Sequence, residues 1–207
     1  MPKILIVFHS RDGMTEALSR AVAEGAAAAG GEVRIRRARE MVTPDVMAMV
    51  PGWADNATRM NALYPAPVAD DAHWADAILF GTPSRFGLVC AEVKAYLDSL
   101  GALWARGQLV NKVGSAFASS GSTHGGNEVT SLTLFVPMAH FGMVIVPPGF
   151  ADPAMFQAGT PYGASAVSHN RPGALPSDAE CAAARFQGRH VTAITAALKG
   201  AGLHPME

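Results

Sequence analysis

The hydrophobic positions of the chain fall into short runs that predict the strands of a parallel sheet. Residues 4–8 form a continuous apolar run, which is typical of a central strand with both faces buried. Residues 32–36 alternate apolar and charged side chains and indicate a half-buried strand nearer the sheet edge. Further apolar runs predict strands over residues 76–81, 113–117 and 143–147.

Apolar residues three and four positions apart predict helices between these strands. The first helix covers residues 14–29 and ends at Gly30-Gly31, and another covers residues 91–100. Because strands and helices alternate along the chain, the sequence predicts an α/β protein: one parallel sheet with helices on both faces.

Two later helices carry local signals of their own. Residues 127–140 predict a helix that Pro137 should kink or shorten, because proline has no N–H group for the helix ladder. The last helix is expected to reach about Lys199. At its start, Ser177 and Glu180 form the pattern of a capping box.

Two segments have no clear period. Residues 41–73 are punctuated by prolines and predict an irregular insertion with one short helix. Residues 148–176 are rich in glycine and proline and predict a long loop. Structureless loops beyond about 15 residues are usually functional or mobile. We therefore expect a single domain over residues 1–200 and a short tail over residues 201–207.

Composition narrows the classes of protein. Of the 207 residues, 49% are hydrophobic and 16% are charged, which excludes an intrinsically disordered chain. The net charge of −1 gives no field that would attract nucleic acid, and it is not the strongly acidic balance of a small electron shuttle. No signal peptide and no membrane span are expected. Cys90 and Cys181 cannot build a disulfide framework. These features favour a cytoplasmic protein with two reduced, packed thiols.

In parallel sheets of this kind, ligands bind at the carboxyl ends of the strands, so the loops that follow the strands should carry the function. The first such loop runs from Ser10 to Thr15 and joins a buried strand to a helix N-terminus. Free N–H groups, the helix dipole and two hydroxyls favour an anion there. The loop lacks both the dinucleotide fingerprint and the P-loop pattern, which suits a monophosphate. The alternative is a capped helix start without a ligand.

The next two loops could grip a planar ligand. Residues 81–87 place backbone amides where they could bond the edge of a heterocycle, with Phe86 as an apolar wall. The alternative is a plain turn between strand and helix. Residues 119–126 are all small or polar and would make a wall rich in hydrogen-bond donors. The alternative for this loop is a flexible linker.

No side chains in the sequence form an evident acid–base pair. Trp104 could stack on a planar substrate, although packing in the core or at an interface is an equal alternative. A lone histidine such as His140 is more often structural, and His124 with His140 does not make a metal site. The loops therefore suggest that a bound cofactor carries the chemistry, and a monophosphate loop beside a heterocycle site suggests FMN.

Seven motifs in order give the chain a resemblance to a known family. It resembles the flavodoxin-like NAD(P)H:quinone oxidoreductases of WrbA type, whose historical name is tryptophan-repressor-binding protein. The resemblance extends from Pro2 to about Lys199 and implies a flavodoxin-like fold, a five-stranded parallel sheet in the order 2-1-3-4-5. The motifs are Ser10-x-x-Gly13, Gly81-Thr-Pro-Ser-Arg-Phe-Gly87, Gly101-Ala-Leu-Trp104, Ser119-Ser-Gly-Ser-Thr-His-Gly-Gly126, Ala139-His-Phe-Gly-Met-Val-Ile-Val-Pro147, Gly159-Thr-Pro-Tyr-Gly-Ala164 and Ala184-Arg-Phe-Gln-Gly188.

The resemblance also implies site residues and an assembly. The implied tetramers place loops of neighbouring subunits at each site. Trp104 and Asp12 are implied to contact the substrates, and Tyr162 to belong to a loop that closes the pocket. The implied FMN-binding residues are Ser10, Arg11, Asp12, Gly13, Met14, Thr15, Ser84, Arg85, Phe86, Ser119, Ser120, Gly121, Ser122, Thr123, His124 and His140.

One departure concerns the nicotinamide donor. Many family members have an aromatic residue where this chain has Asp12, and a carboxylate there would disfavour the phosphates of the dinucleotide. Arg11 could compensate. The implied activity passes two electrons from NADH or NADPH through FMN to a quinone by ping-pong hydride transfer. His140 is the candidate to stabilise or protonate the reduced quinone. The alternatives are a flavodoxin-type electron carrier and a non-enzymatic regulatory or interaction protein.

Overall fold

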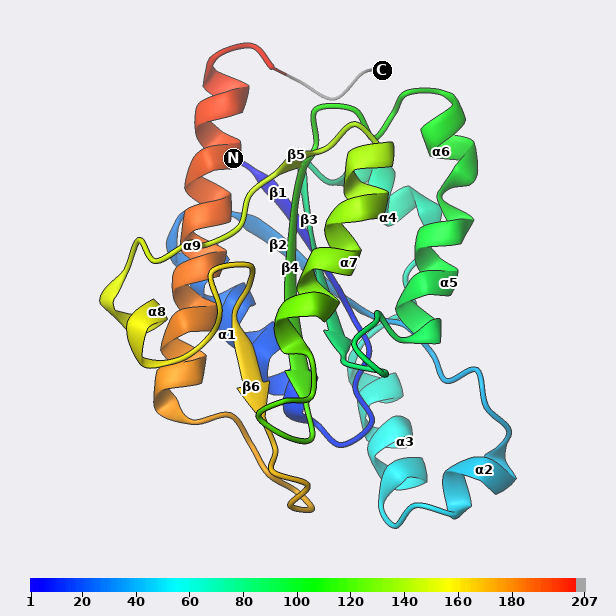
Figure 1. Cartoon of the computed structure of the whole chain (residues 1–207). Helices are drawn as coiled ribbons and strands as arrows, with labels where there is room; N and C mark the ends of the chain where they lie inside the picture. Colours follow the sequence, from blue (N-terminus) through cyan, green and yellow to red (C-terminus); the bar gives the residue numbers. More distant parts are fainter. Residues whose placement is uncertain (204–207) are drawn as a thin grey trace.

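The computed structural model describes residues 1–203, and its centre is a parallel sheet (Figure 1). The strand order is β2-β1-β3-β4-β5, which confirms the expected order, and a sixth strand that the sequence did not predict pairs with β4. The strands are β1 (Lys3–Phe8), β2 (Glu32–Arg37), β3 (Ala77–Pro83), β4 (Val113–Ser120), β5 (Val144–Ile145) and β6 (Ser165–Val167). The two-residue β5 pairs with the start of β4 and β6 with its end, so both share one edge of that strand.

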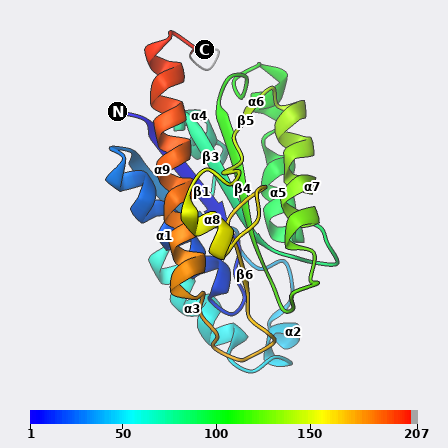
Figure 2. The same ribbon diagram turned by 60° about the vertical axis from the view of Figure 1, so that its left-hand side comes forward.

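Helices cover both faces of the sheet, as Figures 1 and 2 show. On one face, α1 (Met14–Ala28) and α9 (Asp178–Gly200) bury an apolar cluster with β1 and β3. On the other face, α5 (Ala91–Ser99), α6 (Gly101–Ala105) and α7 (Asn127–His140) enclose a second cluster. Within residues 1–203, no helix is both long and apolar enough to cross a membrane.

Most helix boundaries follow the signals in the sequence. The capping box at Ser177 and Glu180 is formed, with the Glu180 N–H donating to Ser177 Oγ at 3.2 Å. Pro137 was expected to kink or shorten its helix, and it does not shorten it, because α7 continues through it to His140. Proline lacks only its own N–H, so the turn that follows it can stay helical.

Of the predicted tail over residues 201–207, residues 204–207 lie outside the described part of the chain.

The insertion between β2 and β3 is more regular than its sequence indicated. It holds α2 (Pro44–Ala48), α3 (Trp53–Leu63) and α4 (Ala69–Trp74) instead of one short helix. In α3 only Trp53, Ala57 and Met60 are buried, so the apolar stripe is too narrow to show as a clear period.

The long loop over residues 148–176 also contains structure. It forms α8 (Pro153–Gln157) and then β6, whose backbone joins the exposed edge of β4. Both elements are shorter than the windows over which a hydrophobic period can be recognised. The chain therefore crosses back to the carboxyl end of the sheet before it enters α9.

Helices α1 and α9 cross at two glycines. A Cβ at Gly188 would lie 2.0 Å from the Val22 carbonyl oxygen, and one at Gly25 would lie 1.9 Å from the Arg185 carbonyl oxygen. Because the backbones touch, Gly188→Ala is expected to lower the free energy of unfolding by about 2–3 kcal/mol. Gly200→Ala is the control, since its Cβ would meet nothing within 4 Å. Urea denaturation measures both; equal stability of the two variants would contradict the close crossing.

Candidate functional site

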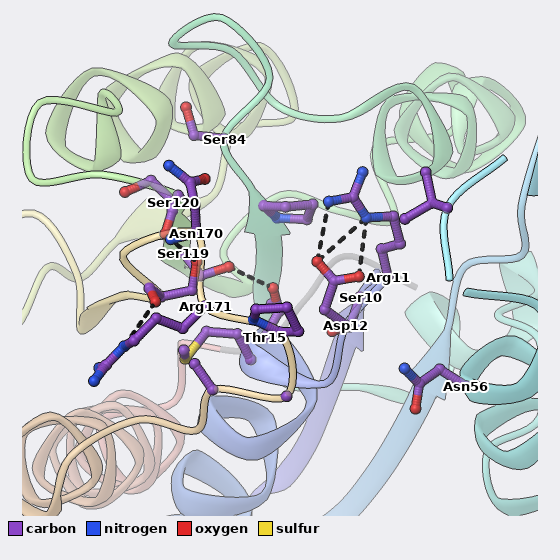
Figure 3. Close-up of a pocket in the computed structure, with 18 of the residues that line it drawn as sticks. Ser10, Arg11, Asp12, Thr15, Asn56, Ser84, Ser119, Ser120, Asn170 and Arg171 are labelled. Carbon is purple, nitrogen blue, oxygen red and sulfur yellow. Dashed lines mark hydrogen bonds and ion pairs between the residues drawn. The ribbon is translucent and has the colours of Figure 1, made fainter. Parts of the chain in front are cut away.

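A cavity of about 440 Å³ opens at the carboxyl ends of β1, β3 and β4 (Figure 3). The loops that follow these three strands form its walls, as expected for this class of sheet. Two further segments contribute: the insertion and the loop after β6. The lining residues are Ser10, Arg11, Asp12, Met14, Thr15, Val50, Pro51, Asn56, Pro83, Ser84, Arg85, Ser119, Ser120, Gly121, Ser168, Asn170, Arg171, Pro172, Gly173 and Ala174.

The first loop leaves the N-terminus of α1 open toward this cavity. Gly13 caps the helix with a left-handed φ of 96°, and its N–H donates to Ser10 Oγ at 3.0 Å. The first helical N–H with a backbone acceptor is that of Ala17, which bonds the Gly13 carbonyl at 2.9 Å. Within the described chain, the N–H groups of Met14 and Thr15 have no acceptor. These groups and the helix dipole suit an anion such as a phosphate monoester.

Hydroxyl groups extend this donor set. Thr15 Oγ1 and Ser119 Oγ lie 2.8 Å apart, and since one hydrogen serves that contact, the other remains for a ligand. The contact also joins the loop after β1 to the end of β4. Two backbone N–H groups and two hydroxyls therefore face this end of the cavity as donors. Such a set fits the phosphate of FMN.

Ser84 locks the second and third loops together. Its N–H donates to the Ser119 carbonyl at 2.7 Å, and its Oγ donates to the Gly125 carbonyl at 2.6 Å. Thr130 Oγ1 and the Gly87 N–H in turn donate to Ser84 Oγ at 2.9 and 3.2 Å. A side chain with all of these partners holds both loops in one arrangement, which suits a rigid wall for a planar ligand.

The structure adds one wall that the sequence did not indicate residue by residue. The Ser168 N–H donates to the Ser120 carbonyl at 2.9 Å, which draws the loop after β6 over the cavity. His169 and Asn170 have left-handed φ values of 53° and 54°. A Cβ at Gly121 would lie 2.3 Å from Asn170 Oδ1, so the two loops touch there. The sequence pointed to this segment by its composition and by its place in the long loop after the fifth predicted strand, residues 148–176, but by no single residue.

Several implied residues of the loops lie outside the lining of the cavity. Phe86 has a φ of 55° and a fully exposed side chain, so within one chain it does not wall the cavity as expected. Ser122, Thr123 and His124 follow the lining part of their loop. Tyr162 is half-buried in the turn before β6 and does not close the cavity.

His140 and Trp104 lie together, but in a different hollow. The Trp104 Nε1 donates to the His140 carbonyl at 3.0 Å, and both residues line an apolar depression of about 320 Å³ between α5 and α7. His140 ends α7 and precedes β5, which pairs with the first residues of β4, whereas Ser119 lies at the other end of β4. Within one chain, they therefore do not line the 440 Å³ cavity, because they sit at the opposite end of the strands, and their place beside a cofactor stays a prediction.

Asp12 forms an ion pair with Arg11 at the rim of the cavity. Arg11 Nε donates to Asp12 Oδ1 at 3.0 Å (Figure 3). The Arg11 guanidinium also lies 5.6 Å from the centre of the Trp53 ring. The Asp12 side chain is half exposed, so solvent screens its charge as well. An ion pair between Arg11 and Asp12 is thus present, and its effect on the dinucleotide stays a prediction.

The two cysteines lie outside the lining of the cavity, and both thiols have raised pKa values. Cys90 is fully buried, and burial raises the pKa of its thiol to about 11 despite a hydrogen bond from Thr82. Burial also raises the pKa of the half-buried Cys181. Over residues 1–203, no group of three His, Cys, Asp or Glu side chains could hold a metal ion.

Helix α3 fastens the first turn of α1 through Glu16. Arg59 Nη1 and the Tyr64 hydroxyl donate to Glu16 Oε1 at 2.9 and 3.0 Å. Burial alone would raise the pKa of Glu16, but the hydrogen bonds from Arg59 and Tyr64 outweigh it and lower that pKa. The ionised carboxylate therefore stabilises the fold.

This network predicts a pH-dependent stability. Since the pKa of Glu16 is lowered in the folded state, its contribution is complete above the ordinary glutamate pKa of about 4.3 and is lost as the pH falls through the lowered value. Glu16→Gln is expected to reduce stability at pH 7 by about 1 kcal/mol, a modest figure because solvent screens the half-exposed Arg59. The deficit should shrink below pH 4. Glu24→Gln, which alters an exposed pair on the same helix, is the control for thermal melts across pH. A deficit that does not depend on pH would contradict this.

Comparison with known proteins gives a family match, similar relatives and a shared fold. Residues 2–156 match the family model described as NADPH-dependent FMN reductase. The chain is 41% identical to an "NAD(P)H dehydrogenase (quinone)" of Sinorhizobium fredii, with 96% of this chain and 99% of that protein covered. It is also 41% identical to a protein of the same name from Geobacter sulfurreducens, with 95% and 99% covered. A solved flavodoxin, WrbA-like protein from Agrobacterium tumefaciens has a TM-score of 0.66 at 23% identity, with 95% and 99% covered.

Proposed function

Because the chain belongs to the NADPH-dependent FMN reductase family, we propose that it is an FMN-dependent oxidoreductase that passes two electrons from NADH or NADPH to a quinone. The observation that carries this proposal is the N-terminus of α1 beside the 440 Å³ cavity, where the N–H groups of Met14 and Thr15 have no acceptor in the described chain. Relatives named for quinone reduction, similar over nearly their whole length, support the acceptor class. A ping-pong order, in which donor and quinone use one face in turn, belongs to the same proposal, as does membership of the WrbA type.

Different loops of the cavity would hold different parts of the cofactor. When bound, FMN supplies a ring that accepts and releases a hydride equivalent. Residues 10–15 would hold its phosphate by N–H and hydroxyl donors, Ser84 and Arg85 would border the ring, and residues 119–121 would form the opposite wall. The hydrogen bonds of Ser84 keep the last two loops in register, which lowers the cost of ordering them on binding.

We assign Trp104 and His140 to the cavity of a neighbouring copy. In one chain they lie at the far edge of the sheet, yet the Trp104 side chain is 54% exposed in an apolar hollow, as an interface residue would be. Fully exposed Phe86 and the exposed Val129 on α7 suit the same assembly. A homotetramer would let Trp104 stack on the quinone while His140 stabilises or protonates the reduced product. We place the enzyme in the cytoplasm, where its buried thiols would stay reduced.

The choice of donor depends on Asp12. Asp12→Asn removes a negative charge from the rim and releases Arg11 for the phosphates of the dinucleotide. The KM for NADH or NADPH is expected to fall by about threefold at low ionic strength, and less in salt. Steady-state kinetics measure this, with Asp55→Asn as the control for an exposed carboxylate outside the cavity. An unchanged KM at low salt would show that Asp12 does not face the dinucleotide.

Turnover assays test the function directly. The purified protein, loaded with FMN, is expected to oxidise NADH or NADPH only when a quinone such as a substituted benzoquinone or naphthoquinone is present. Parallel lines in double-reciprocal plots of the initial rate, taken at several fixed quinone concentrations, would identify the ping-pong order. A protein that binds FMN but draws electrons from neither donor would fit the flavodoxin-type carrier. A protein that binds no FMN would fit the regulatory or interaction protein, and either result would overturn the proposal.

A further inference from the structure

A fully buried arginine lies directly behind the first loop. Arg37 is the last residue of β2, pairs in register with Phe8 of β1, and has no exposed surface. Its Nη2 donates to the Ser10 carbonyl at 3.0 Å, and its Nη1 donates to Asn61 Oδ1 at 2.6 Å. Both guanidinium Nη atoms also bond the carboxylate of Glu40. Arg37 does not line the cavity, whereas Ser10 does.

Stability alone is a poor reason to bury this side chain. Removing a charged pair from water is expensive, and apolar side chains of similar volume often stabilise a fold as well or better. The Arg37 Nε has no acceptor among residues 1–203, so the guanidinium is not even fully satisfied. The side chain is therefore better explained by what it holds than by the energy of its own contacts.

The geometry of the peptide unit shows what the contact with Ser10 does. A trans peptide is planar, so the carbonyl of Ser10 and the N–H of Arg11 point in opposite directions. Arg37 draws this carbonyl toward the interior, which aims the N–H of Arg11 the other way. That N–H has no acceptor within the described chain. Without Arg37, the carbonyl could turn toward the cavity, where its negative end would repel an anion.

The insertion fixes Arg37 in its place. Asn61 lies on α3, and Glu40 also accepts a hydrogen bond from Trp53 Nε1 at 3.3 Å. Tyr64 packs edge-on against Phe8, with ring centres 5.2 Å apart. The guanidinium thus bridges β2, the first loop and α3 behind the cavity.

We propose that Arg37 is a positioning residue, which orients the Ser10–Arg11 peptide so that the first loop binds the phosphate of FMN, and that Glu40 and α3 hold it in register. This inference rests on the proposed function, because it presupposes FMN at this loop. It concerns affinity for the phosphate group and not for the ring. The phosphate contribution is measured by comparing FMN with riboflavin, which has the same ring and no phosphate.

The test is flavin-fluorescence titration of the full-length apoprotein and its variants with both ligands. In Arg37→Met/Glu40→Met, which preserves net charge and leaves neither charge of the pair buried alone, the preference for FMN over riboflavin is expected to fall by about 10-fold or more. The Kd for riboflavin should change by less than about twofold. Arg36→Met is the control for the loss of an arginine from β2, since Arg36 lies next in the strand, pairs with Asp71 and does not touch the first loop.

The outcomes separate the two proposals. A double variant that keeps the wild-type preference would overturn the role of Arg37, and so would an equal loss in Arg36→Met. Wild-type protein that binds FMN and riboflavin equally would show that the first loop does not bind the phosphate, and it would also overturn the role of Arg37. Wild-type protein that binds neither would overturn the proposed function itself. If the double variant does not fold, Arg37→Lys is measured instead. A lysine ammonium does not reproduce the planar arrangement of guanidinium donors that bonds both Ser10 and Glu40, so the preference for FMN over riboflavin must fall.

Discussion

Thr15→Asp is expected to abolish the binding of FMN while the protein remains folded. Thr15 lies in the first turn of α1, where the N–H groups of Met14 and Thr15 have no acceptor in the described chain. A carboxylate there would take these donors for itself and repel the phosphate, and we expect the affinity for FMN to fall by about 100- to 1000-fold. The fold should tolerate the change, because aspartate is favourable in the first turn of a helix.

The same substitution elsewhere serves as the control. Thr43→Asp places a carboxylate at the exposed start of α2, outside the cavity, and should leave the affinity for FMN unchanged. Thr15→Val removes only the hydroxyl and should cost about 10-fold. Isothermal titration and thermal melts of the apoproteins measure both quantities. A Thr15→Asp variant that binds FMN as tightly as the wild type would mean that the phosphate lies elsewhere.

Mixing two inactive variants is expected to restore turnover. Thr15→Asp should lack FMN, and Trp104→Ala/His140→Ala should keep FMN but lose about 100-fold or more in quinone turnover. If each cavity is completed by a neighbouring copy, mixed oligomers contain some sites with an intact loop from one chain and intact Trp104 and His140 from another. Random mixing at equal amounts should then recover about a quarter of the wild-type activity.

Co-expression of the two chains with different affinity tags allows this measurement. A chain that carries all three substitutions, co-expressed with Thr15→Asp, is the control and should recover nothing. Activity of the mixture that does not exceed the sum of the parts would show that no site draws on a second copy. A fully active Trp104→Ala/His140→Ala variant would remove both residues from the mechanism.

The sequence predicted the sheet well because continuous apolar runs can be buried only between two layers of helices. The five expected strands occupy the expected order, and the loops after β1, β3 and β4 meet at one edge. Short elements were missed for the opposite reason. Residues 165–167 form a strand only because the edge of β4 offers hydrogen bonds, and α2 and α4 are too short to show a period.

The positions of His140 and Trp104 illustrate a different limit. Motifs place residues in a family's site, but they do not say which copy of the chain supplies them. Topology gives part of the answer. His140 ends the helix that returns from β4 to the start of β5, so it must lie near the amino ends of the strands. Arg37 was missed because a charged residue at the end of an alternating strand is ordinarily solvated. Only the packed structure shows that it is buried behind Ser10.

Anaerobic reduction of the FMN-loaded protein tests the central claim most directly. We predict that about one equivalent of NADH or NADPH per bound FMN bleaches the flavin absorbance completely. One equivalent of quinone, added after the donor is consumed, should restore it. Flavin that stays oxidised in excess of both donors, or reduced flavin that a quinone does not reoxidise, would contradict the account.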